Sequence, residues 1–310
     1  MSTTESVSGS QAFEPDPRND DLLVWINGRL VPRAEATVSV FDAGFVLGDG
    51  VWEGIRLVNG RLVFLDQHLD RLLQGAAQIR LDIGLDRAGL AAALCRTVEA
   101  NGMRDGAHLR LMVTRGTKSS PNQDPRQVTG PATIVITAEY KAPPPALYRR
   151  GLALATSGFR TSGPETFDMR LNSHSRLNLV QALLEAMERG ADEALMLDPH
   201  GNVASCNATN FFVVRDGTVR TSSGEYCFNG ITRAQIIDLC RGNGIPIEVG
   251  DFSLAEAQSA DEAFVTGTFG GVVPIRSLDG EDYPGPLPGP FTGRIAALYR
   301  ARVESESLHG

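Results

Sequence analysis

Two Asn-Gly pairs, each set between short apolar runs, constrain the fold of this chain more than any other feature. Asn27-Gly28 stands between residues 22–26 and 29–31, and Asn59-Gly60 stands between 55–58 and 61–64. Both residue types tolerate the positive φ angles of a two-residue turn, so each pair predicts a β-hairpin. The first part of the chain is therefore expected to build an antiparallel sheet.

Two helices and two further strands are predicted after the hairpins. Apolar residues recur at helical spacing over residues 66–79, and a second helix is predicted over 87–100. Strands are expected at 107–114 and 132–138, and a Gly-rich connection, 41–50, joins the two hairpins. A sheet combined with two helices indicates an α+β unit.

A proline-rich stretch that begins at Lys141 marks the predicted domain boundary. Residues 141–146 read Lys-Ala-Pro-Pro-Pro-Ala, which favours a stiff linker. We therefore predict a leader at 1–20, an N-terminal α+β domain at 21–140, a linker at 141–150, a second domain at 151–304 and a tail at 305–310. The second domain is expected to be mostly β with outer helices. Its predicted elements are strands at 152–156, 193–197, 211–214, 218–221 and 262–266, and helices at 176–189, 232–240 and 290–303.

Composition narrows the classes of protein to which the chain can belong. The 310 residues are 42% hydrophobic and carry a net charge of −8, which is typical of a globular protein and unlike a nucleic-acid binder. No apolar run is long enough to span a membrane. The leader is rich in Ser, Glu and Pro, which predicts disorder and no signal peptide, so we expect a cytoplasmic protein. The four cysteines and five histidines are scattered, which predicts no metal site.

Two segments of the second domain combine small residues with hydroxyl groups. Gly230-Ile231-Thr232-Arg233 opens a predicted helix, where main-chain amides and the helix dipole favour an anion. Residues 264–271, which include Gly267 and Thr268, follow a predicted strand and offer further donors. Taken alone, Thr232 also fits an ordinary N-cap, and 264–271 also fits an ordinary turn at the end of a strand.

The order and spacing of several motifs resemble one known family. The motifs are Gly48-Asp-Gly-Val-Trp-Glu53, His68-Leu-Asp-Arg71, Ala191-Asp-Glu-Ala-Leu-Met-Leu197, Asn207-Ala-Thr-Asn210-Phe-Phe, Gly230-Ile-Thr-Arg233 and Ala260-Asp-Glu-Ala-Phe-Val-Thr-Gly-Thr268. Together they resemble the class IV aminotransferases, which include branched-chain and D-amino acid aminotransferases, (R)-amine transaminases and aminodeoxychorismate lyase. The resemblance extends from about Leu22 to Arg302.

This resemblance implies a fold, a cofactor and an assembly. It implies a pyridoxal-phosphate (PLP) enzyme of fold type IV, with an N-terminal α/β sandwich-like domain, a C-terminal pseudo-β-barrel and a homodimeric assembly. It also implies the residues that bind the cofactor phosphate, namely Arg71, Ile231, Thr232, Gly267 and Thr268. A surface arginine on an amphipathic helix is the alternative for Arg71.

The chain departs from the family at the position of the Schiff-base lysine. The family places this lysine fourteen residues before the alanine of a Glu-Ala pair, which here is Glu185-Ala186. This count gives Asn172, and a shift of one residue in either direction also gives no lysine. The only lysines are Lys118 and Lys141. An asparagine amide is not basic and forms no imine, so the resemblance implies that PLP or its amine form, PMP, is held noncovalently.

A second departure affects the carboxylate that pairs with the pyridine nitrogen of the cofactor. Ser205 stands at the position of that glutamate. A serine hydroxyl carries no charge that would keep the ring nitrogen protonated, so fast transamination is not expected. One engineered substitution would explain Asn172 but not Ser205 as well, and we interpret the two changes as natural divergence.

Several residues are candidates for the lost functions. His174 is either a structural hydrogen-bonding residue or a proton-transfer residue. Lys118 either binds a substrate carboxylate or is a surface lysine, and the nearby Ser120 and Asn122 align with the carboxylate-binding Arg and His of D-amino acid aminotransferases. Trp52 either walls the substrate pocket or packs in the core.

Three functions remain open from the sequence. The first is an atypical class IV enzyme that acts on an amino or keto acid or an amine. The second is a pseudoenzyme that binds a phosphorylated ligand or a partner protein. The third is an enzyme that uses the same cleft without PLP.

Overall fold

The computed structural model describes residues 9–309 and divides the chain into two compact units. The N-terminal unit comprises Pro15–Ala142, Leu171–Arg176 and the end of the chain from Val303. The described part of the C-terminal unit comprises residues 9–14, Pro143–Arg170 and Leu177–Arg302. The segment that carries Asn172 was predicted within the second domain, yet it belongs to the N-terminal unit.

The N-terminal unit contains a six-stranded antiparallel sheet in the order β2-β1-β6-β5-β3-β4. Its strands are β1 (Leu23–Ile26), β2 (Arg29–Pro32), β3 (Gly50–Val58), β4 (Arg61–Leu62), β5 (Ala107–Thr114) and β6 (Thr133–Tyr140). Both predicted hairpins are confirmed, and Asn27, Gly28, Asn59 and Gly60 all have positive φ angles.

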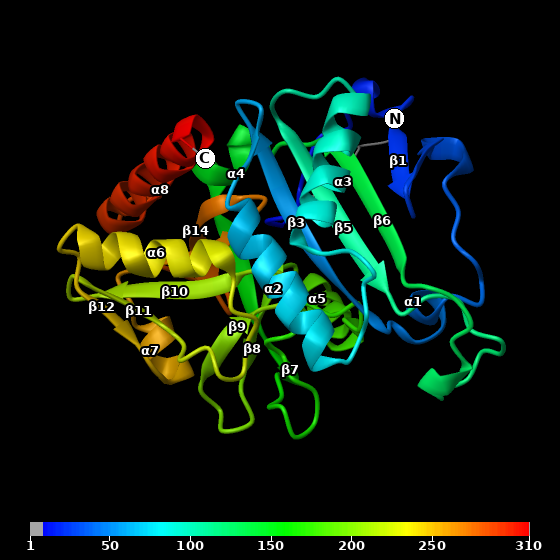
Figure 1. Cartoon of the computed structure of the whole chain (residues 1–310). Helices are drawn as coiled ribbons and strands as arrows, with labels where there is room; N and C mark the ends of the chain where they lie inside the picture. The colour runs from blue at the N-terminus through cyan, green and yellow to red at the C-terminus, as the bar shows by residue number, and fades with distance from the viewer. Residues whose placement is uncertain (1–8, 310) are drawn as a thin grey trace, which may run out of the picture. The chain divides into compact units, whose positions relative to one another are not determined.

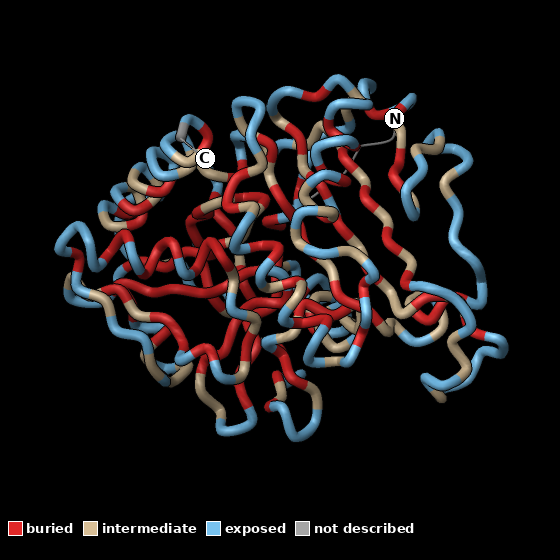
Figure 2. The backbone as a smooth tube through the Cα atoms, in the orientation of Figure 1, coloured by how far each residue is buried: buried red, intermediate tan, exposed pale blue. Residues whose placement is uncertain are grey.

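Helices α2 (Leu65–Gln78) and α3 (Arg87–Ala100) cover one face of this sheet (Figure 1). The apolar core lies between the helices and the sheet, and Figure 2 shows buried stretches along β3, β5 and β6. Its largest fully buried side chains are Ile55, Leu57, Leu69, Leu72, Leu90, Leu94, Leu109, Leu111 and Ile136. Successive strand residues point to opposite faces, so Trp52 and Arg110 stand on the face away from this core.

The Gly-rich connection between the hairpins contains a short helix that the sequence did not predict, α1 (Ala43–Leu47). The Asp42 carboxylate accepts a hydrogen bond from the Gly44 amide (2.8 Å), and Gly48 ends the helix with a φ of 68°. The described part of the unit also contains the 3-10 turns η1 (Pro17–Asn19), η2 (Arg33–Glu35) and η3 (Pro125–Gln127).

The C-terminal unit contains a nine-stranded mixed sheet in the order β12-β11-β10-β13-β14-β7-β8-β9, with β15 paired to β14. Its strands are β7 (Leu152–Arg160), β8 (Glu193–Leu197), β9 (Val203–Cys206), β10 (Asn210–Arg215), β11 (Thr218–Thr221), β12 (Ile247–Val249), β13 (Glu262–Gly267), β14 (Gly271–Leu278) and β15 (Glu281–Asp282). The sheet curls so that its two ends meet. Val203 on β9, at one end, donates to the Phe252 carbonyl just after β12 (2.9 Å), and Ser222, just after β11, donates to the Ala204 carbonyl on β9 (2.7 Å). The expected α+β class with a pseudo-barrel is therefore confirmed.

The helices of this unit are α4 (Pro145–Arg150), α5 (Leu177–Glu188), α6 (Ile231–Gly242), α7 (Leu254–Gln258) and α8 (Pro290–His309). Helix α4 forms within the predicted linker, because prolines are tolerated in a first helical turn. The final residues of α8 belong to the N-terminal unit, where the Ser307 hydroxyl accepts from Asn59 Nδ2 (3.1 Å). Along residues 9–309, no helix is both long and apolar enough to cross a membrane.

The predicted disordered leader is ordered over the part that the structure describes, residues 9–20. Ser10 and Ala12 are buried, and the Ser10 amide donates to Glu193 (3.0 Å). A buried polar partner and a small apolar contact thus hold a segment whose composition alone predicts disorder. Residues 1–8 of the predicted leader lie outside the described residues.

Candidate functional site

A buried ion pair fixes Arg71 on α2. Glu53 on β3 is fully buried and accepts hydrogen bonds from Arg71 Nε (2.8 Å) and Nη2 (2.6 Å). The Nδ1 atom of His68 lies 2.7 Å from the same carboxylate. Burial alone raises the pKa of Glu53, but Arg71 and His68 outweigh it, so this pKa lies below its ordinary value. Arg71 is therefore not a freely exposed surface arginine, and its side chain is 19% exposed.

Asn172, which is predicted to stand at the lysine position, is fixed against β3. The Trp52 amide donates to the Asn172 carbonyl (2.9 Å), and the His174 amide donates to the Gly50 carbonyl (3.0 Å). The side-chain Nδ2 of Asn172 donates to the Trp52 carbonyl, and Oδ1 accepts from Arg176 Nη2 (2.8 Å). Asn172 is 6% exposed, so its amide is a buried group with partners on both sides.

Arg176 closes the loop that carries Asn172, and its contact with Asn172 was not predicted from the sequence. Its Nε donates to the Ser173 carbonyl and its Nη2 to the Leu171 carbonyl, both at 2.9 Å. Burial, the neighbouring charges of Arg110 and Arg71, and a smaller opposing effect of Glu53 bring its pKa to about 10. A guanidinium thus lies directly beside Asn172, which is predicted to stand at the position of the family lysine.

His174 has a buried ring nitrogen without a hydrogen-bond partner. No partner for Nε2 exists among the described residues. Burial, followed by the charge of Arg110, lowers the His174 pKa to about 4, although a hydrogen bond to the main chain at Val51 opposes this shift. The imidazole is therefore neutral at pH 7. Because Nδ1 is used at Val51, Nε2 is the nitrogen left to accept a proton.

Trp52 stands outside the apolar core of the N-terminal unit. The Arg110 guanidinium lies 3.6 Å from the centre of the Trp52 ring, and Trp52 Nε1 donates to the Ser173 carbonyl (3.1 Å). The half-buried indole is not part of the cluster that contains Val51 and Ile55. Core packing, one of the two interpretations of Trp52, is therefore wrong, and a role as a pocket wall stays a prediction.

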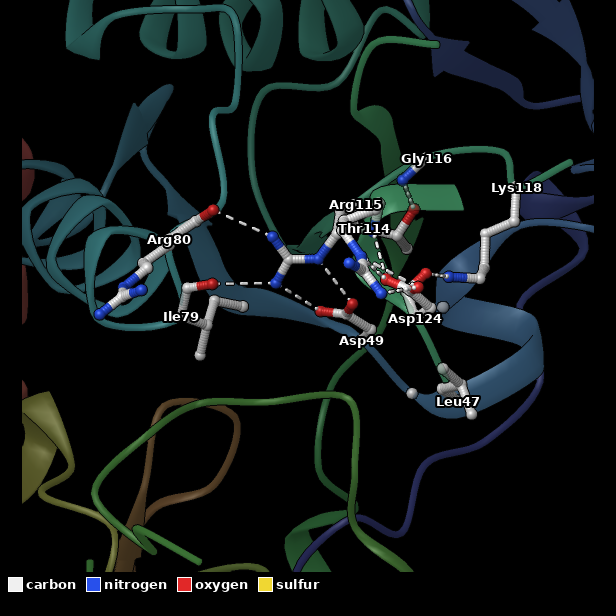
Figure 3. A network of polar contacts seen from close by, with 12 residues as sticks. Leu47, Asp49, Ile79, Arg80, Thr114, Arg115, Gly116, Lys118 and Asp124 are labelled. Atoms are coloured by element: carbon white, nitrogen blue, oxygen red, sulfur yellow. Dashed lines mark hydrogen bonds and ion pairs between the residues drawn. The ribbon is translucent and has the colours of Figure 1, made fainter. Parts of the chain in front are cut away.

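Lys118 is a buried residue and not a surface lysine. It is 3% exposed, its Nζ donates to the Asp124 carbonyl (2.7 Å), and its amide donates to the Phe41 carbonyl (2.9 Å). Figure 3 shows the Lys118 side chain directed at Asp124. Ser120 and Asn122 are exposed on the same loop, and Asn122 Oδ1 accepts from the Asp124 amide (3.0 Å). Binding of a substrate carboxylate by this loop stays a prediction.

Arg115 and Asp49 form a further ion pair in the N-terminal unit, which the sequence analysis did not identify (Figure 3). Arg115 Nε and Nη2 bind the two Asp49 oxygens at 2.6 and 2.9 Å. The same guanidinium donates to the carbonyls of Ile79 and Arg80, both at 2.9 Å. It therefore ties the end of α2 to the residue before β3, and so supports both Arg71 and the strand beside Asn172.

Ser205 on β9 uses its hydroxyl proton within its own loop. Its Oγ donates to the Thr209 carbonyl (2.7 Å) and accepts from Asn210 Nδ2 (3.3 Å). A hydroxyl has a single proton to donate. Ser205 can therefore donate to another acceptor only when it releases Thr209.

Helix α6 begins without a side-chain cap. The N-cap residue Gly230 has no side chain, so the first amides, including those of Ile231 and Thr232, receive no capping bond. The Gly230 amide itself donates to Asn210 Oδ1 (3.2 Å). A Cβ at Gly230 would lie 2.4 Å from the same atom, so a side chain at this position would clash. The helix start is thus an open donor site for an anion.

Tyr299 on α8 connects the start of α6 to the turn after β13. Its hydroxyl lies 3.4 Å from the Thr232 hydroxyl, and its ring lies 3.3 Å from a Cβ placed on Gly271. Thr268 is half-buried in that turn, and a Cβ at Gly267 would make ordinary contact with Thr209. The C-terminal unit thus brings together the helix start and the turn that were predicted to bind phosphate.

The predicted site residues divide between the two units. Arg71, Asn172, His174, Lys118, Trp52, Ser120 and Asn122 lie in the N-terminal unit, and Ser205, Ile231, Thr232, Gly267 and Thr268 lie in the C-terminal unit. The convergence of the two groups on one ligand stays a prediction. Within residues 9–309, no three His, Cys, Asp or Glu side chains are grouped so that they could hold a metal ion.

Comparison with known proteins gives consistent matches. The family model described as amino-transferase class IV matches residues 50–278. The branched-chain-amino-acid aminotransferase-like protein 1 of Arabidopsis thaliana is 35% identical over 294 residues, which cover 95% of this chain and 53% of that protein. The chain therefore spans about half the length of this relative. A putative branched-chain-amino-acid aminotransferase of Methanocaldococcus jannaschii is 33% identical over 280 residues, which cover 90% of this chain and 96% of that protein.

A solved structure matches over most of the chain. It is a branched-chain aminotransferase from the thermophilic archaeon Thermoproteus uzoniensis, solved with norvaline. Its TM-score is 0.83 and its sequence identity is 32%, and the match covers 92% of this chain and 96% of that one. A second branched-chain amino acid aminotransferase, solved as a complex with N-(5'-phosphopyridoxyl)-L-glutamate, has a TM-score of 0.84 and 28% identity, with 92% and 95% covered.

Proposed function

This chain belongs to the class IV aminotransferase family, and we propose that it is an enzyme that acts on an amino acid, a keto acid or an amine with noncovalently held PLP or PMP. One combination of observations carries the proposal. The start of α6 is an open donor site beside Thr232, while the lysine position holds the hydrogen-bonded Asn172. The chain thus keeps the means to bind a phosphate and lacks the amine for a covalent link.

Donors of the C-terminal unit fit the phosphate of PLP or PMP. The amides of Ile231 and Thr232 and the hydroxyls of Thr232 and Thr268 can supply hydrogen bonds, and we assign the positive charge to Arg71. The second of the two solved relatives holds a phosphopyridoxyl compound, which supports this class of ligand. When bound, the cofactor supplies an electron sink for bond changes at the carbon that carries the amino group.

Ser205 fits the ring nitrogen less well than a glutamate does. Its hydroxyl proton is already donated to the Thr209 carbonyl, and the residue has no charge. The ring nitrogen therefore gains no counter-charge from this position. We expect a slow reaction, because the electron sink is weakened when the ring nitrogen is not protonated.

His174 is the residue to which we assign proton transfer. Its Nε2 is unpartnered among the described residues and its imidazole is neutral at pH 7, so this nitrogen can accept a proton and return it. Asn172 cannot do so, because an amide is not a base at neutral pH. Lys118 is assigned to a substrate carboxylate, because its buried ammonium group is paired with a carbonyl and with no carboxylate in the described chain.

One observation favours a pseudoenzyme as the second candidate. The Asn172 amide and the Ser205 hydroxyl are both already hydrogen-bonded within the chain. Residues that are satisfied in this way need no ligand to complete them. A protein that binds a phosphorylated ligand at α6 without turnover would have these two features.

A homodimer is the proposed assembly. Helix α5 exposes four large apolar residues at helical spacing, and its small residues Ala182 and Ala186 face the sheet. The exposed residues are Leu177, Val180, Leu184 and Met187. In the N-terminal unit, Val40, Phe41 and Phe45 are exposed as well. Exposed apolar side chains of this size on one helix are typical of a protein interface, and a second copy of this chain is the expected partner.

Ligand titration tests the proposed function. Protein stripped of small molecules is titrated with PMP, with PLP and with inorganic phosphate, and binding is followed by equilibrium dialysis. Saturable binding of PMP or PLP, followed by formation of a keto acid from L- or D-amino acids or of a ketone or aldehyde from amines, supports the enzyme. Binding without any product over a long incubation indicates the pseudoenzyme. No binding of either cofactor form overturns the proposal and leaves an enzyme that works without PLP.

A further inference from the structure

Glu193, at the start of β8, is a buried carboxylate without a cation. It is 2% exposed, and no Lys, Arg or His is paired with it in the part of the chain that the structure describes. Burial raises its pKa. The adjacent Asp192 differs, because it is paired with Arg150 (2.8 Å). A buried carboxylate is costly unless donors surround it, so the donors around Glu193 identify what it holds together.

One donor comes from the start of the chain. The Ser10 amide donates to Glu193 Oε1 at 3.0 Å, and the Ser10 hydroxyl is also hydrogen-bonded to this side chain. Ser10 lies in a turn closed by the Ala12 amide, which donates to the Gly9 carbonyl (3.0 Å). A Cβ at Gly270 would lie 3.6 Å from the Ser10 carbonyl oxygen. Residues 9–12, here called the strap, therefore pack against the turn that contains Thr268.

The other donor belongs to the loop that carries Ser205. Thr209 Oγ donates to Glu193 Oε2 at 2.8 Å, and the Thr209 carbonyl accepts from the Ser205 hydroxyl at 2.7 Å. The Cys206 amide donates to the same carbonyl (3.0 Å). Because a carboxylate only accepts, the Thr209 proton must point at Glu193. A continuous series of hydrogen bonds thus leads from Ser10 through Glu193 and Thr209 to Ser205.

We infer that Glu193 is a positioning residue for the cofactor, because it joins the strap to Thr209 and so fixes the loop that presents Ser205 to the cofactor ring. This inference rests on the proposed function. It gives the start of the chain a part in cofactor binding, although no residue of the strap needs to touch the ligand. Ser10 and Glu193 would act on both predicted cofactor elements of this unit, the Ser205 loop directly and the Thr268 turn through the strap.

Matched pairs of variants in the full chain test the inference. Ser10→Pro removes the amide donor and the hydroxyl, whereas Ser10→Ala keeps the amide. Thr209→Val removes the hydroxyl, whereas Thr209→Ser keeps it. Glu193→Gln keeps the volume and removes the acceptor-only carboxylate. PMP affinity is measured by equilibrium dialysis, the absorption and fluorescence of bound PMP report the ring environment, and thermal unfolding without PMP reports stability.

We expect Ser10→Pro, Thr209→Val and Glu193→Gln to weaken PMP binding by about tenfold or more and to change the spectrum of the bound form, because each disrupts the hydrogen bonds of the buried Glu193 side chain. Thr209→Ser should bind PMP within about threefold of the parent, since it retains the hydroxyl, and Ser10→Ala should lie between Ser10→Pro and the parent, since it keeps the amide bond to Glu193 and loses only the hydroxyl. Lower thermal stability with unchanged affinity and spectrum in all three disruptive variants would overturn the inference. If Ser10→Pro fails to fold, the two Thr209 variants test the inference, and if Thr209→Val fails to fold, the two Ser10 variants test it. If the parent protein binds no PMP or PLP, the proposed function fails first, and the inference fails with it.

Discussion

Replacing Asn172 by lysine should lower the free energy of unfolding by an amount that can be estimated from the contacts of Asn172. The asparagine side chain makes two hydrogen bonds, one to the Trp52 carbonyl and one from Arg176. A lysine can still donate to Trp52, but it cannot accept from Arg176. Loss of a hydrogen bond to a charged group costs about 1.5–3 kcal/mol. Arg176 keeps its bonds to Leu171 and Ser173, so we expect Asn172→Lys to lose about 2 kcal/mol of unfolding free energy.

The new amine should also be reactive. It would stand beside Arg176, whose own pKa is already lowered to about 10 by burial and by its cationic neighbours. The same burial and charges lower the pKa of a lysine at position 172, which leaves neutral amine near pH 7. Incubation with PLP followed by borohydride should therefore fix the cofactor to residue 172. Adding Ser205→Glu should supply the ring counter-charge and raise keto-acid formation by more than the sum of the single effects.

Two measurements and one control complete this test. Urea unfolding gives the stability, and intact-mass and peptide mass spectrometry locate the cofactor. Asn172→Met serves as the control, because it also loses the bond from Arg176 and adds no amine, although it loses the bond to the Trp52 carbonyl as well. The reasoning is refuted if Asn172→Lys binds PLP, remains as stable as the parent and carries no cofactor after reduction. That result would mean that residue 172 does not stand where the family has its lysine.

Three further predictions follow from single contacts. Arg71→Lys keeps a charge but loses the fork that binds Glu53, so PMP affinity measured by dialysis should fall about tenfold, whereas Arg71→Ala would leave buried Glu53 with His68 but without its guanidinium and cost about 3 kcal/mol of stability. The folded His174 pKa of about 4 lies below its ordinary value of 6.5, so the unfolded state binds more protons between these values and stability falls as the pH drops from 6.5 towards 4. Urea titrations should show a smaller fall in His174→Gln, and an equal fall would contradict the shift. Leu184→Asp on α5 should convert a dimer to a monomer in light scattering, and a parent protein that is already monomeric would refute the proposed assembly.

Local sequence signals predicted most regular elements of both units. The Asn-Gly turns and the helical spacing in 66–79 and 87–100 depend on neighbouring residues only, and the corresponding hairpins and helices are present. Helix α1 was missed because its start depends on the Asp42 cap inside a Gly-rich segment. Strand β14 was missed because Gly271 and Pro274 interrupt its pattern, while pairing with β13 and β7 stabilises it.

In the candidate site, the sequence identified individual residues but not the contacts that hold them in place. Motif spacing identified Arg71 and Asn172, but only the fold shows that Glu53 holds the first and Arg176 the second. The pairing of the Asn172 segment with β3 joins residues about 120 positions apart, which no local pattern reveals. The buried Lys118 likewise lies in a segment whose main chain is hydrogen-bonded to the distant Phe41 carbonyl. Predictions from sequence were therefore least accurate where a contact crosses the chain.

Borohydride reduction of the natural protein saturated with PLP tests the central claim most directly. The protein is reduced, denatured and divided into polypeptide and small-molecule fractions, and both are analysed by mass spectrometry. The account predicts an unchanged polypeptide mass and the cofactor recovered in the small-molecule fraction, because Asn172 offers no amine. A polypeptide that gains the mass of the reduced cofactor at Lys118 or Lys141 would contradict it, since a relocated lysine would then replace the lost one.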